Sequence, residues 1–338
     1  MERQRQIESW LASLHPGRSF TLRPASADAS FRRYFRVHFG DAASAIVMDA
    51  PPQREDCRPW LAVQALFGAA GAHVPEVLAE DLQRGFLLLS DLGDSTYLPL
   101  LRSATSAQAA ALYGDAIAAL LRIQTASRPG VLPAYDRALL LRELQLFPEW
   151  YVARHLQASL SPAQQQLVHE AFEALLQVNL GEACVFVHRD YHARNLMHVA
   201  AGQGQNPGII DFQDAVYGPI SYDLVSLFKD AYITWDEELT LDWLIRYWEA
   251  ARRAALPVPA DFAEFHRNYE WMGAQRHLKV LGIFARLYHR DGKSGYLQDM
   301  PRVADYLHKT CTRYRELGPL AQLLDSLQGQ QKTSGYSF

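Results

Sequence analysis

The residues most able to do chemistry lie in the stretches VFVHRDYHARNLMH and IIDFQD. The first places His188, Asp190 and Asn195 at the spacing H-x-D-x-x-x-x-N, and the second places Asp211 after an apolar run. Phosphoryl transfer needs metal ions that neutralise nucleotide oxygens and a carboxylate that orients the attacking hydroxyl. We predict that Asp190 is this catalytic carboxylate, that Asn195 and Asp211 hold Mg²⁺, and that His188 braces the catalytic loop.

Both acidic residues are expected at strand ends, where the backbone can hold them at the rim of a cleft. CVFVHRD and GIIDF are short β-rich segments, and the connection AAGQGQNPG between them is rich in turn-forming residues. A connection of this kind places the second strand at a hairpin's distance from the first. We therefore expect neighbouring hairpin arms to carry the catalytic and the metal-binding residues.

Strand patterns dominate the chain ahead of these motifs. FRRYFRVHF alternates apolar and polar residues, which is typical of a half-buried strand, and SAIVMDA and GFLLLSDLG predict further strands around a helix over 59–70. Beyond about residue 104 the apolar spacing becomes helical. It predicts helices over 110–124, 139–157, 163–178, 239–253, 262–289 and 303–328.

These patterns predict an α+β protein with a small β-rich N-terminal lobe and a larger, mainly helical C-terminal lobe. The N-terminal lobe, which would bind the nucleotide, is expected to cover residues 1–92, including the segment that links the lobes. Residues 93–328 would form the helical lobe with the catalytic and metal loops, and 329–338 a disordered tail.

Composition narrows the class of protein. The 338 residues include 33 Lys and Arg against 37 Asp and Glu, so the formal charge of -4 gives no basic excess for nucleic acid. Cys57, Cys184 and Cys311 are widely spaced, which favours a reducing cytoplasm over disulfides or zinc. No apolar run reaches the ~18 residues of a membrane span. We expect a cytoplasmic, monomeric protein that acts on a small molecule, without a nucleic-acid or membrane partner.

Several motifs resemble a known superfamily. HRDYHARN, IIDFQD and GPISYDL resemble the aminoglycoside phosphotransferases and choline kinases, relatives of the eukaryotic protein kinases, over nearly the whole chain. This resemblance implies a bilobal protein-kinase-like fold, the use of ATP and Mg²⁺, and a bracing role for Asp223 in the sequence YDL. More narrowly, ASADASFRRYFRV, VMDAPP, LLLSDLGD and FHRNYEWMGAQRHLKVLGIFARL resemble the bacterial anomeric sugar kinases of cell-wall recycling. That implies transfer of the γ-phosphate of ATP to the C1 hydroxyl of N-acetylmuramic acid or N-acetylglucosamine, which gives the α-1-phosphate.

The nucleotide side departs from the usual kinase pattern. ASADASFRR contains no glycine, and Met48 stands where a kinase has a lysine that pairs with phosphate. We expect Arg32 or Arg33, together with Ser30 and nearby backbone N–H groups, to replace that charge. Strand alternation sends the two arginines to opposite faces, so one of them would reach the phosphates. The adenine edge would meet the backbone of Ser90 to Leu92.

An aminosugar pocket should combine carboxylates, amides and an aromatic wall. The better candidates are His192 and Gln213, because they lie inside or beside the motifs. An arginine would suit the lactyl carboxylate of N-acetylmuramic acid. Further candidates are Glu143, Arg154, Tyr217, Trp271, Gln275 and Arg276.

Two other functions remain open from the sequence. A cationic acceptor such as an aminoglycoside or choline should demand an acidic or aromatic-caged pocket, and the helical part shows no obvious acidic cluster. A nucleotide-binding pseudokinase scaffold would explain Met48, but it would not need Asp190, Asn195 and Asp211 together.

Overall fold

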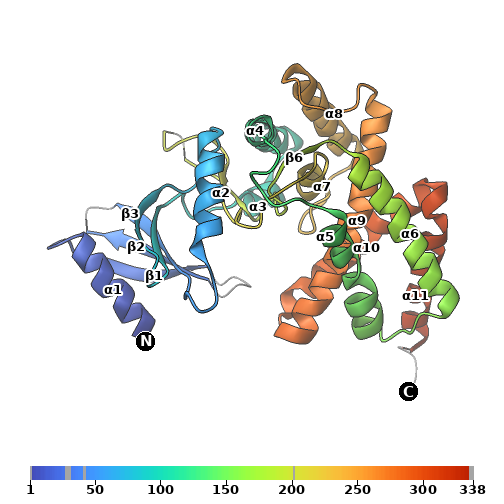
Figure 1. The fold of residues 1–338 in the computed structure, drawn as a ribbon, viewed down its shortest axis with the longest axis horizontal. Coiled ribbons are helices and arrows are strands. Elements are labelled where there is room, and N and C mark those ends of the chain that lie inside the picture. The colour runs from blue at the N-terminus through green and yellow to red at the C-terminus, as the bar shows by residue number, and fades with distance from the viewer. Residues whose placement is uncertain (1, 27–31, 41–42, 201, 335–338) are drawn as a thin grey trace. The chain divides into compact units, whose positions relative to one another are not determined.

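The computed structural model describes residues 2–26, 32–40, 43–200 and 202–334 (Figure 1). The chain divides into two compact units. Unit 1 contains the described residues of 1–97 and 195–214, and unit 2 contains those of 98–194 and 215–338. Unit 1 is therefore made of two separate stretches of the sequence.

Unit 1 is built on a five-stranded antiparallel sheet with the order β1-β2-β3-β5-β4 (Figure 1). Along β2, Phe35, Val37 and Phe39 are buried while Arg33 and His38 are exposed. The alternation predicted from FRRYFRVHF is thus confirmed over Arg33–Phe39, and Phe31 lies outside the described residues. The strands are β1 (Phe20–Ser26), β2 (Arg33–Phe39), β3 (Ser44–Asp49), β4 (Val77–Asp81) and β5 (Phe86–Ser90).

Two helices pack in unit 1. In α1 (Glu2–Leu14), Ile7, Trp10 and Leu11 share one apolar stripe and join the core formed by β2, β3 and β5. Helix α2 (Cys57–Ala69) confirms the helix predicted over 59–70, although it begins two residues earlier and ends one residue earlier. The carboxylate of Asp56 caps it by accepting from the backbone N–H of Arg58 at 3.0 Å.

The short strands around the motifs pair differently from the prediction. Strand β6 (Cys184–Val187) pairs with β9 (Val216–Pro219), and β7 (Leu196–Met197) pairs with β8 (Gly208–Ile209). The segments before Asp190 and Asp211 are therefore not arms of one hairpin. The reason is that β7, which directly follows Asn195, takes the edge of β8 that the prediction gave to β6.

Unit 2 is mainly helical (Figure 1). Its centre is the 30-residue helix α9, in which long runs such as 269–282 are buried. The helices are α3 (Tyr97–Ser103), α4 (Ser106–Thr125), α5 (Arg137–Leu144), α6 (Pro162–Gly181), α7 (Tyr222–Phe228), α8 (Glu237–Arg253), α9 (Phe262–Asp291), α10 (Met300–Arg313) and α11 (Gly318–Ser334). Short irregular helices are η1 (Phe147–His155), η2 (Ser294–Asp299) and η3 (Arg315–Leu317).

Two predicted helices are broken. The prediction over 139–157 becomes α5 followed by the π-helix η1, which begins at Phe147 beside Pro148. The prediction over 303–328 becomes α10, η3 and α11, because Tyr314 is extended, with φ -111° and ψ 123°. Proline removes a backbone donor, and one extended residue ends the helical hydrogen-bond ladder.

The contact-based division differs from the predicted domain boundaries. It places 195–214, which the prediction assigned to the helical lobe, in unit 1. The reason is that β7 pairs with the segment that follows β5, and β8 pairs with His73, which follows α2. Helix α11 also continues to Ser334, six residues beyond the predicted end at 328.

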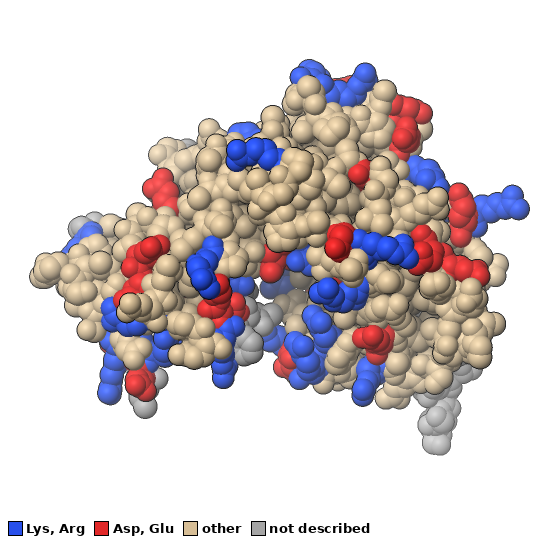
Figure 2. Space-filling view, in the orientation of Figure 1, with Lys and Arg blue, Asp and Glu red and all other residues tan. Residues whose placement is uncertain are grey.

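The surface carries mixed charge. Figure 2 shows acidic and basic side chains interspersed over the visible face, in keeping with the nearly balanced composition. All three cysteines are free thiols; Cys57 and Cys311 are buried and Cys184 is exposed. Within the described ranges, no helix combines the length and apolarity needed to cross a membrane.

Candidate active site

The loop that carries Asp190 begins in unit 2 where β6 ends. The backbone N–H groups of His188 and Arg189 donate to the carboxylate of Asp223 at 2.7 and 3.0 Å. Asp223 is buried in the first turn of α7, and this burial raises its pKa to about 6. The two bonds hold Arg189 at φ 75°, a left-handed conformation that residues other than glycine seldom adopt. Asp223 therefore braces the loop, as the family resemblance implied.

Asp190 presents a partly exposed carboxylate on this loop. Its side chain is 44% exposed, and one oxygen lies 3.5 Å from Nη2 of Arg276. The backbone N–H of Asp190 donates to Nδ1 of the buried His188 at 3.3 Å. Desolvation opposes ionisation of Asp190, but the charges of Arg276 and Lys279 outweigh it and hold the pKa of Asp190 below the usual carboxyl range. Asp190 is thus an accessible anion at neutral pH.

A buried ionic network lies beneath the loop. The carboxylate of Glu143 on α5 accepts from Arg189, from Lys279 at 2.9 Å and from the hydroxyl of Tyr135, with Gln275 at 3.5 Å. Burial disfavours the charged form of Glu143, yet Lys279 and Arg189 lower its pKa. Its carboxylate is therefore engaged inside unit 2, where it positions two of the cations.

Arg276 joins this network to the loop. Its Nη1 donates to the carbonyl of Arg189 at 2.8 Å and to the hydroxyl of Tyr222 at 3.0 Å. Lys279 donates to the same hydroxyl at 2.9 Å. Since α9 carries both cations one turn apart, this helix sets the charge around Asp190.

The middle of the loop is held by a second buried acid. The backbone N–H of Ala193 donates to Asp230 at 3.0 Å, and the other oxygen of Asp230 accepts from the backbone N–H of Tyr232 at 2.9 Å. The ring of His192 meets that of Tyr232 edge to face, with 5.3 Å between centroids. Burial lowers the pKa of His192 to about 3, so its imidazole is neutral at pH 7.

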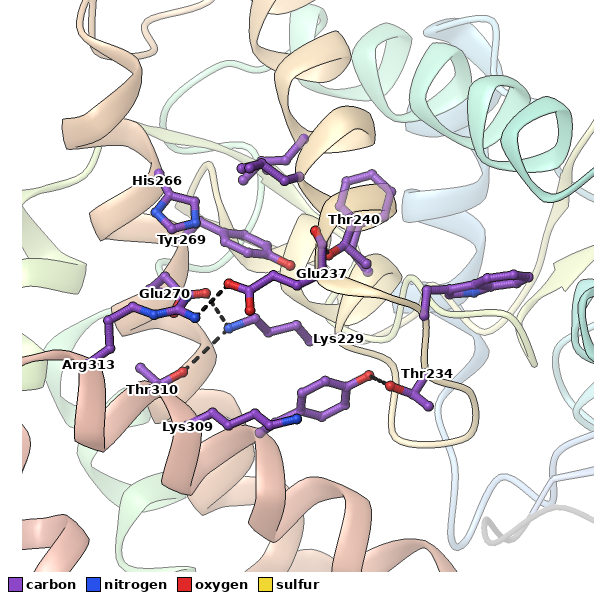
Figure 3. A pocket seen from close by; sticks show the side chains of 15 residues that line it. Lys229, Thr234, Glu237, Thr240, His266, Tyr269, Glu270, Lys309, Thr310 and Arg313 are labelled. Carbon is purple, nitrogen blue, oxygen red and sulfur yellow. Dashed lines mark hydrogen bonds and ion pairs between the residues drawn. The ribbon is translucent and has the colours of Figure 1, made fainter. Parts of the chain in front are cut away.

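A cavity of about 100 Å³ lies beside the segment that follows α7 (Figure 3). Lys229, which precedes Asp230, donates to Glu270 in it and lies 3.4 Å from Oγ1 of Thr310. Arg313 bridges Glu270 and Glu237 at 2.9 and 2.6 Å. These ion pairs connect α8, α9 and α10 around the segment that carries Asp230. The cavity was not predicted from the sequence.

Asn195 and Asp211 lie together in unit 1. Strands β7 and β8 follow and precede them, and Nδ2 of Asn195 lies 3.3 Å from Oδ2 of Asp211. The amide of Gln213 donates to Oδ1 of Asp211 at 2.9 Å. Phe212, between Asp211 and Gln213, packs its ring on Trp60 and Phe67 of α2, with centroid distances of 5.1 and 5.9 Å.

This pair fits the chemistry of magnesium. Mg²⁺ binds proteins through one or two oxygen side chains together with substrate phosphates and water. The carboxylate of Asp211 and the amide oxygen that Asn195 presents after a rotation of its amide group supply two hard oxygen ligands. Among the residues that the structure describes, no group of three or more His, Cys, Asp or Glu could hold a metal by itself.

The predicted phosphate-binding arginines have different surroundings. Arg33 is paired with the buried carboxylate of Asp49, with Nε at 3.1 Å, and Arg3 binds the same carboxylate. Nε of Arg32 lies 3.8 Å from Glu55, a longer contact. Ser30 lies outside the described residues. Met48 is fully buried in β3.

The segment after β5 is more constrained than the sequence suggested. The backbone N–H of Ser90 donates to the carbonyl of Glu76 at 2.9 Å, and its hydroxyl accepts from the backbone N–H of Glu76. Arg36 pairs with Asp91 at 2.7 Å and donates to the carbonyl of Gly93. Ser90 therefore uses its backbone donor within unit 1, whereas Leu92 is a buried apolar residue beside it.

The remaining predicted substrate residues do not gather at one place. Trp271 is buried on another face of α9 from Arg276, under the guanidinium of Arg267 and against Tyr314. Arg154 is exposed on η1, and Tyr217 lies in β9 with its ring facing Phe186. The structure thus groups Arg276 and His192 with Asp190, and Gln213 with Asp211.

Sequence reasoning missed several residues of this site. Lys279 pairs with Glu143 beneath the loop, Asp230 accepts from Ala193 within it, and Arg36 and Asp91 secure the segment after β5. Lys279 had a usable signal, because it follows the predicted Arg276 by three positions on one helix. Asp230 had none, since 37 positions separate it from Ala193.

Comparisons with known proteins agree with this geometry. Residues 21–265 match the model of the phosphotransferase enzyme family (APH). A protein from Neisseria meningitidis serogroup B named N-acetylmuramate/N-acetylglucosamine kinase is 50% identical over 340 residues, covering 100% of both chains. Among solved structures, ADP-bound aminoglycoside phosphotransferase APH(2'')-Ib has a TM-score of 0.59 at 14% identity, covering 89% of this chain and 96% of that one.

A choline/ethanolamine kinase family protein from Mesorhizobium loti has a TM-score of 0.64 at 14% identity, covering 95% of this chain and 99% of that one. At this identity the two structures establish the fold, and the kinase-like α+β class predicted from the sequence is confirmed. The family model and the relative from Neisseria meningitidis go further. By both measures, this chain belongs to the phosphotransferase enzyme family.

Proposed function

We propose that the protein transfers the γ-phosphate of ATP to the anomeric C1 hydroxyl of N-acetylmuramic acid or N-acetylglucosamine, giving the α-1-phosphate for peptidoglycan recycling in the cytoplasm. One observation carries the catalytic part: Asp190 is an accessible carboxylate kept ionised by buried cations on a loop that Asp223 braces. The relative named N-acetylmuramate/N-acetylglucosamine kinase supports the choice of acceptor.

Asp190 would act as the base in this reaction. Its carboxylate accepts a hydrogen bond from the C1 hydroxyl and takes the proton as oxygen bonds to phosphorus and the bond to ADP breaks. A carboxylate with a lowered pKa is a weak base, which suits late proton transfer. The anomeric hydroxyl is more acidic than an ordinary alcohol, so a weak base is sufficient.

Asn195 and Asp211 would hold Mg²⁺, and Gln213 would orient the Asp211 carboxylate through its 2.9 Å hydrogen bond. When bound, the ion neutralises phosphate oxygens of the nucleotide. The arrangement on the β7–β8 hairpin supports this assignment, because it fixes both side chains on one short element.

For the nucleotide, we favour Arg32 over Arg33 as the phosphate-binding cation. Arg33 already neutralises the buried Asp49, and its removal would leave that charge with less compensation. Arg32, in contrast, lies 3.8 Å from Glu55. Ser30 stays a candidate from the sequence. The backbone at Leu92 is the better candidate for the adenine edge, since the Ser90 donor is used.

For the acceptor, we favour His192 and Arg276 because both belong to the surroundings of Asp190. Glu143 fits a positioning role, whereas Trp271 is buried elsewhere in unit 2 and Arg154 is exposed on η1. Arg276, Lys279 and Arg189 place positive charge around Asp190, and this speaks against a cationic aminoglycoside or choline as the acceptor.

A coupled ADP-release assay with a panel of acceptors tests the function. We expect release with N-acetylmuramic acid or N-acetylglucosamine, and phosphorus NMR of the product should show an α-1-phosphate. The Asp190→Asn variant should lose about 100-fold or more of turnover while it still binds ATP. Release with choline or an aminoglycoside instead would reject the acceptor, and ATP binding without turnover on any acceptor would favour a scaffold.

A further inference from the structure

Arg194 is the last residue of the catalytic loop in unit 2, and neither the motif nor the mechanism above gives it a role. Its side chain is exposed, and its guanidinium carbon lies 4.6 Å from the ring centroid of Tyr232 and 5.9 Å from that of Tyr296. A guanidinium that lies over aromatic rings is held flat, and its planar fork of N–H donors matches the geometry of a carboxylate.

The aromatic support is assembled from separate elements. Tyr232 comes from the segment after α7 and Tyr296 from η2, and Phe284 of α9 contacts both rings, with centroid distances of 6.1 and 5.0 Å. Tyr232 and Tyr296 are only partly buried. These rings therefore form a rigid apolar wall beside an exposed cation, a combination suited to the apolar face and the anionic group of a sugar acid.

This wall is close to the catalytic carboxylate. Asp190 and Arg194 both act electrostatically on the hydroxyl of Tyr232, and the ring of His192 packs against Tyr232. Arg276, by contrast, is turned inward: its side chain is 8% exposed, and it donates to the carbonyl of Arg189 and to Tyr222. Arg194 is thus the exposed cation of the loop.

We propose that Arg194 is the residue that selects an acceptor bearing a carboxylate, by binding the lactyl carboxylate of N-acetylmuramic acid against the wall of Tyr232 and Tyr296. N-acetylglucosamine has the same ring and acetamide but no carboxylate, so Arg194 contributes nothing comparable to it. This inference rests on the proposed function, because it assumes that both sugars are phosphorylated at C1.

The test compares kcat/KM for the two sugars in wild type and in Arg194→Gln. We expect kcat/KM for N-acetylmuramic acid to fall about 10- to 100-fold, the range for lost hydrogen bonds to a charged group, and kcat/KM for N-acetylglucosamine to change less than about 3-fold. Arg194→Lys should give an intermediate loss, because it keeps the charge without the planar fork. Arg290→Gln, an exposed arginine paired with Asp291, is the matched control.

The methyl ester of N-acetylmuramic acid completes a double-mutant-type cycle, in which the substrate carboxylate, the Arg194 guanidinium or both are removed. Wild type and Arg194→Gln should use the ester equally well. An equal loss on both sugars, or a raised KM for ATP, would overturn the inference and assign Arg194 to the phosphates instead. The inference would also be overturned if the ratio of kcat/KM for the two sugars were the same in Arg194→Gln and in wild type. Failure of the proposed function has a different signature, because wild type would then phosphorylate neither sugar.

Discussion

Asp190 owes its charge to neighbours on α9, and this can be tested through the pH dependence of the reaction. In Arg276→Gln the lost positive charge leaves desolvation less opposed, so the pKa of Asp190 rises. In the proposed mechanism the reaction needs the ionised carboxylate of Asp190, and we therefore expect the acid limb of the kcat/KM profile to move to higher pH. Arg267→Gln, on another face of the same helix, should leave the limb in place. An identical acid limb in Arg276→Gln and wild type would show that Arg276 does not tune Asp190.

Among single residues, the sequence brings the candidate reactive residues together more readily than the residues that support them. His188, Asp190 and Asn195 lie within eight positions of one another, so their spacing alone places them near one loop. The pairing of Asn195 with Asp211 was also foreseen, although a different strand pairing achieves it. Supports such as Asp230 come from other elements, and no local pattern marks a carboxylate that will accept from a distant backbone N–H group.

The junction of α6, β6 and α7 contains a buried acid with a marked pH effect. The carboxylate of Glu182 accepts from the hydroxyl of Ser221 at 2.8 Å and from its backbone N–H at 3.3 Å. Burial outweighs these bonds and raises the pKa of Glu182 to about 8. A pKa raised on folding gives stability that is present at low pH and is lost as the pH rises from the unfolded value, near 4.5, towards 8.

We therefore predict that Glu182→Gln, which cannot ionise, becomes more stable relative to wild type as the pH rises from about 5 to about 8. The slope is at most about 1.4 kcal/mol per pH unit. Urea unfolding of both proteins at several pH values measures it, and Glu173→Gln on the exposed face of α6 is the control. A constant difference between Glu182→Gln and wild type over this range would mean that Glu182 stays ionised in the folded protein.

Helix α9 approaches the segment before η1 closely, and a glycine permits it. A Cβ atom built on Gly282 would lie 2.4 Å from the carbonyl carbon and oxygen of Leu146. Since this neighbour is backbone, Gly282→Ala should destabilise unit 2 by about 1–3 kcal/mol, as overpacking does. Thermal unfolding would measure the change, with Gly295→Ala, which has open space around its Cβ position, as the control. Equal melting temperatures for Gly282→Ala and wild type would show that the backbone before η1 can shift at little cost in stability.

Element boundaries show where local patterns stop being sufficient. The breaks at η1 and η3 lie inside stretches whose apolar spacing is helical, so the spacing alone does not reveal them. The sequence nevertheless contains helix-breaking residues near both breaks, namely Pro148, Gly318 and Pro319. Strand pairing had no comparable marker. Two-residue strands such as β7 and β8 are defined by their partners, and periodicity does not reveal a partner.

For the whole molecule, the division into units follows contacts rather than chain order. The sequence predicted one boundary after residue 92, but 195–214 returns to unit 1. Asn195 follows Asp190 by only five positions, so the chain passes from one unit to the other within the motif. A linear pattern cannot reveal such a return, because the contacts that cause it join segments about a hundred positions apart, such as Ser95 and His198.

Because Asp190 lies in unit 2 and Asp211 lies in unit 1, we expect their substitutions to have different effects on stabilisation of the protein by nucleotide. A ligand that binds only the folded state stabilises it, by about 2.7 kcal/mol at a concentration 100 times its Kd. We predict that ATP with Mg²⁺ raises the melting temperature of wild type and of Asp190→Asn. The rise should be lost in Asp211→Ala, and EDTA should remove it from wild type. Asp214→Ala, an exposed acid near Asp211, is the control that should keep most of the rise. If Asp211→Ala kept the full Mg²⁺-dependent rise, Asp211 would not hold the metal. If Asp190→Asn lost it, Asp190 would serve nucleotide binding rather than the acceptor hydroxyl.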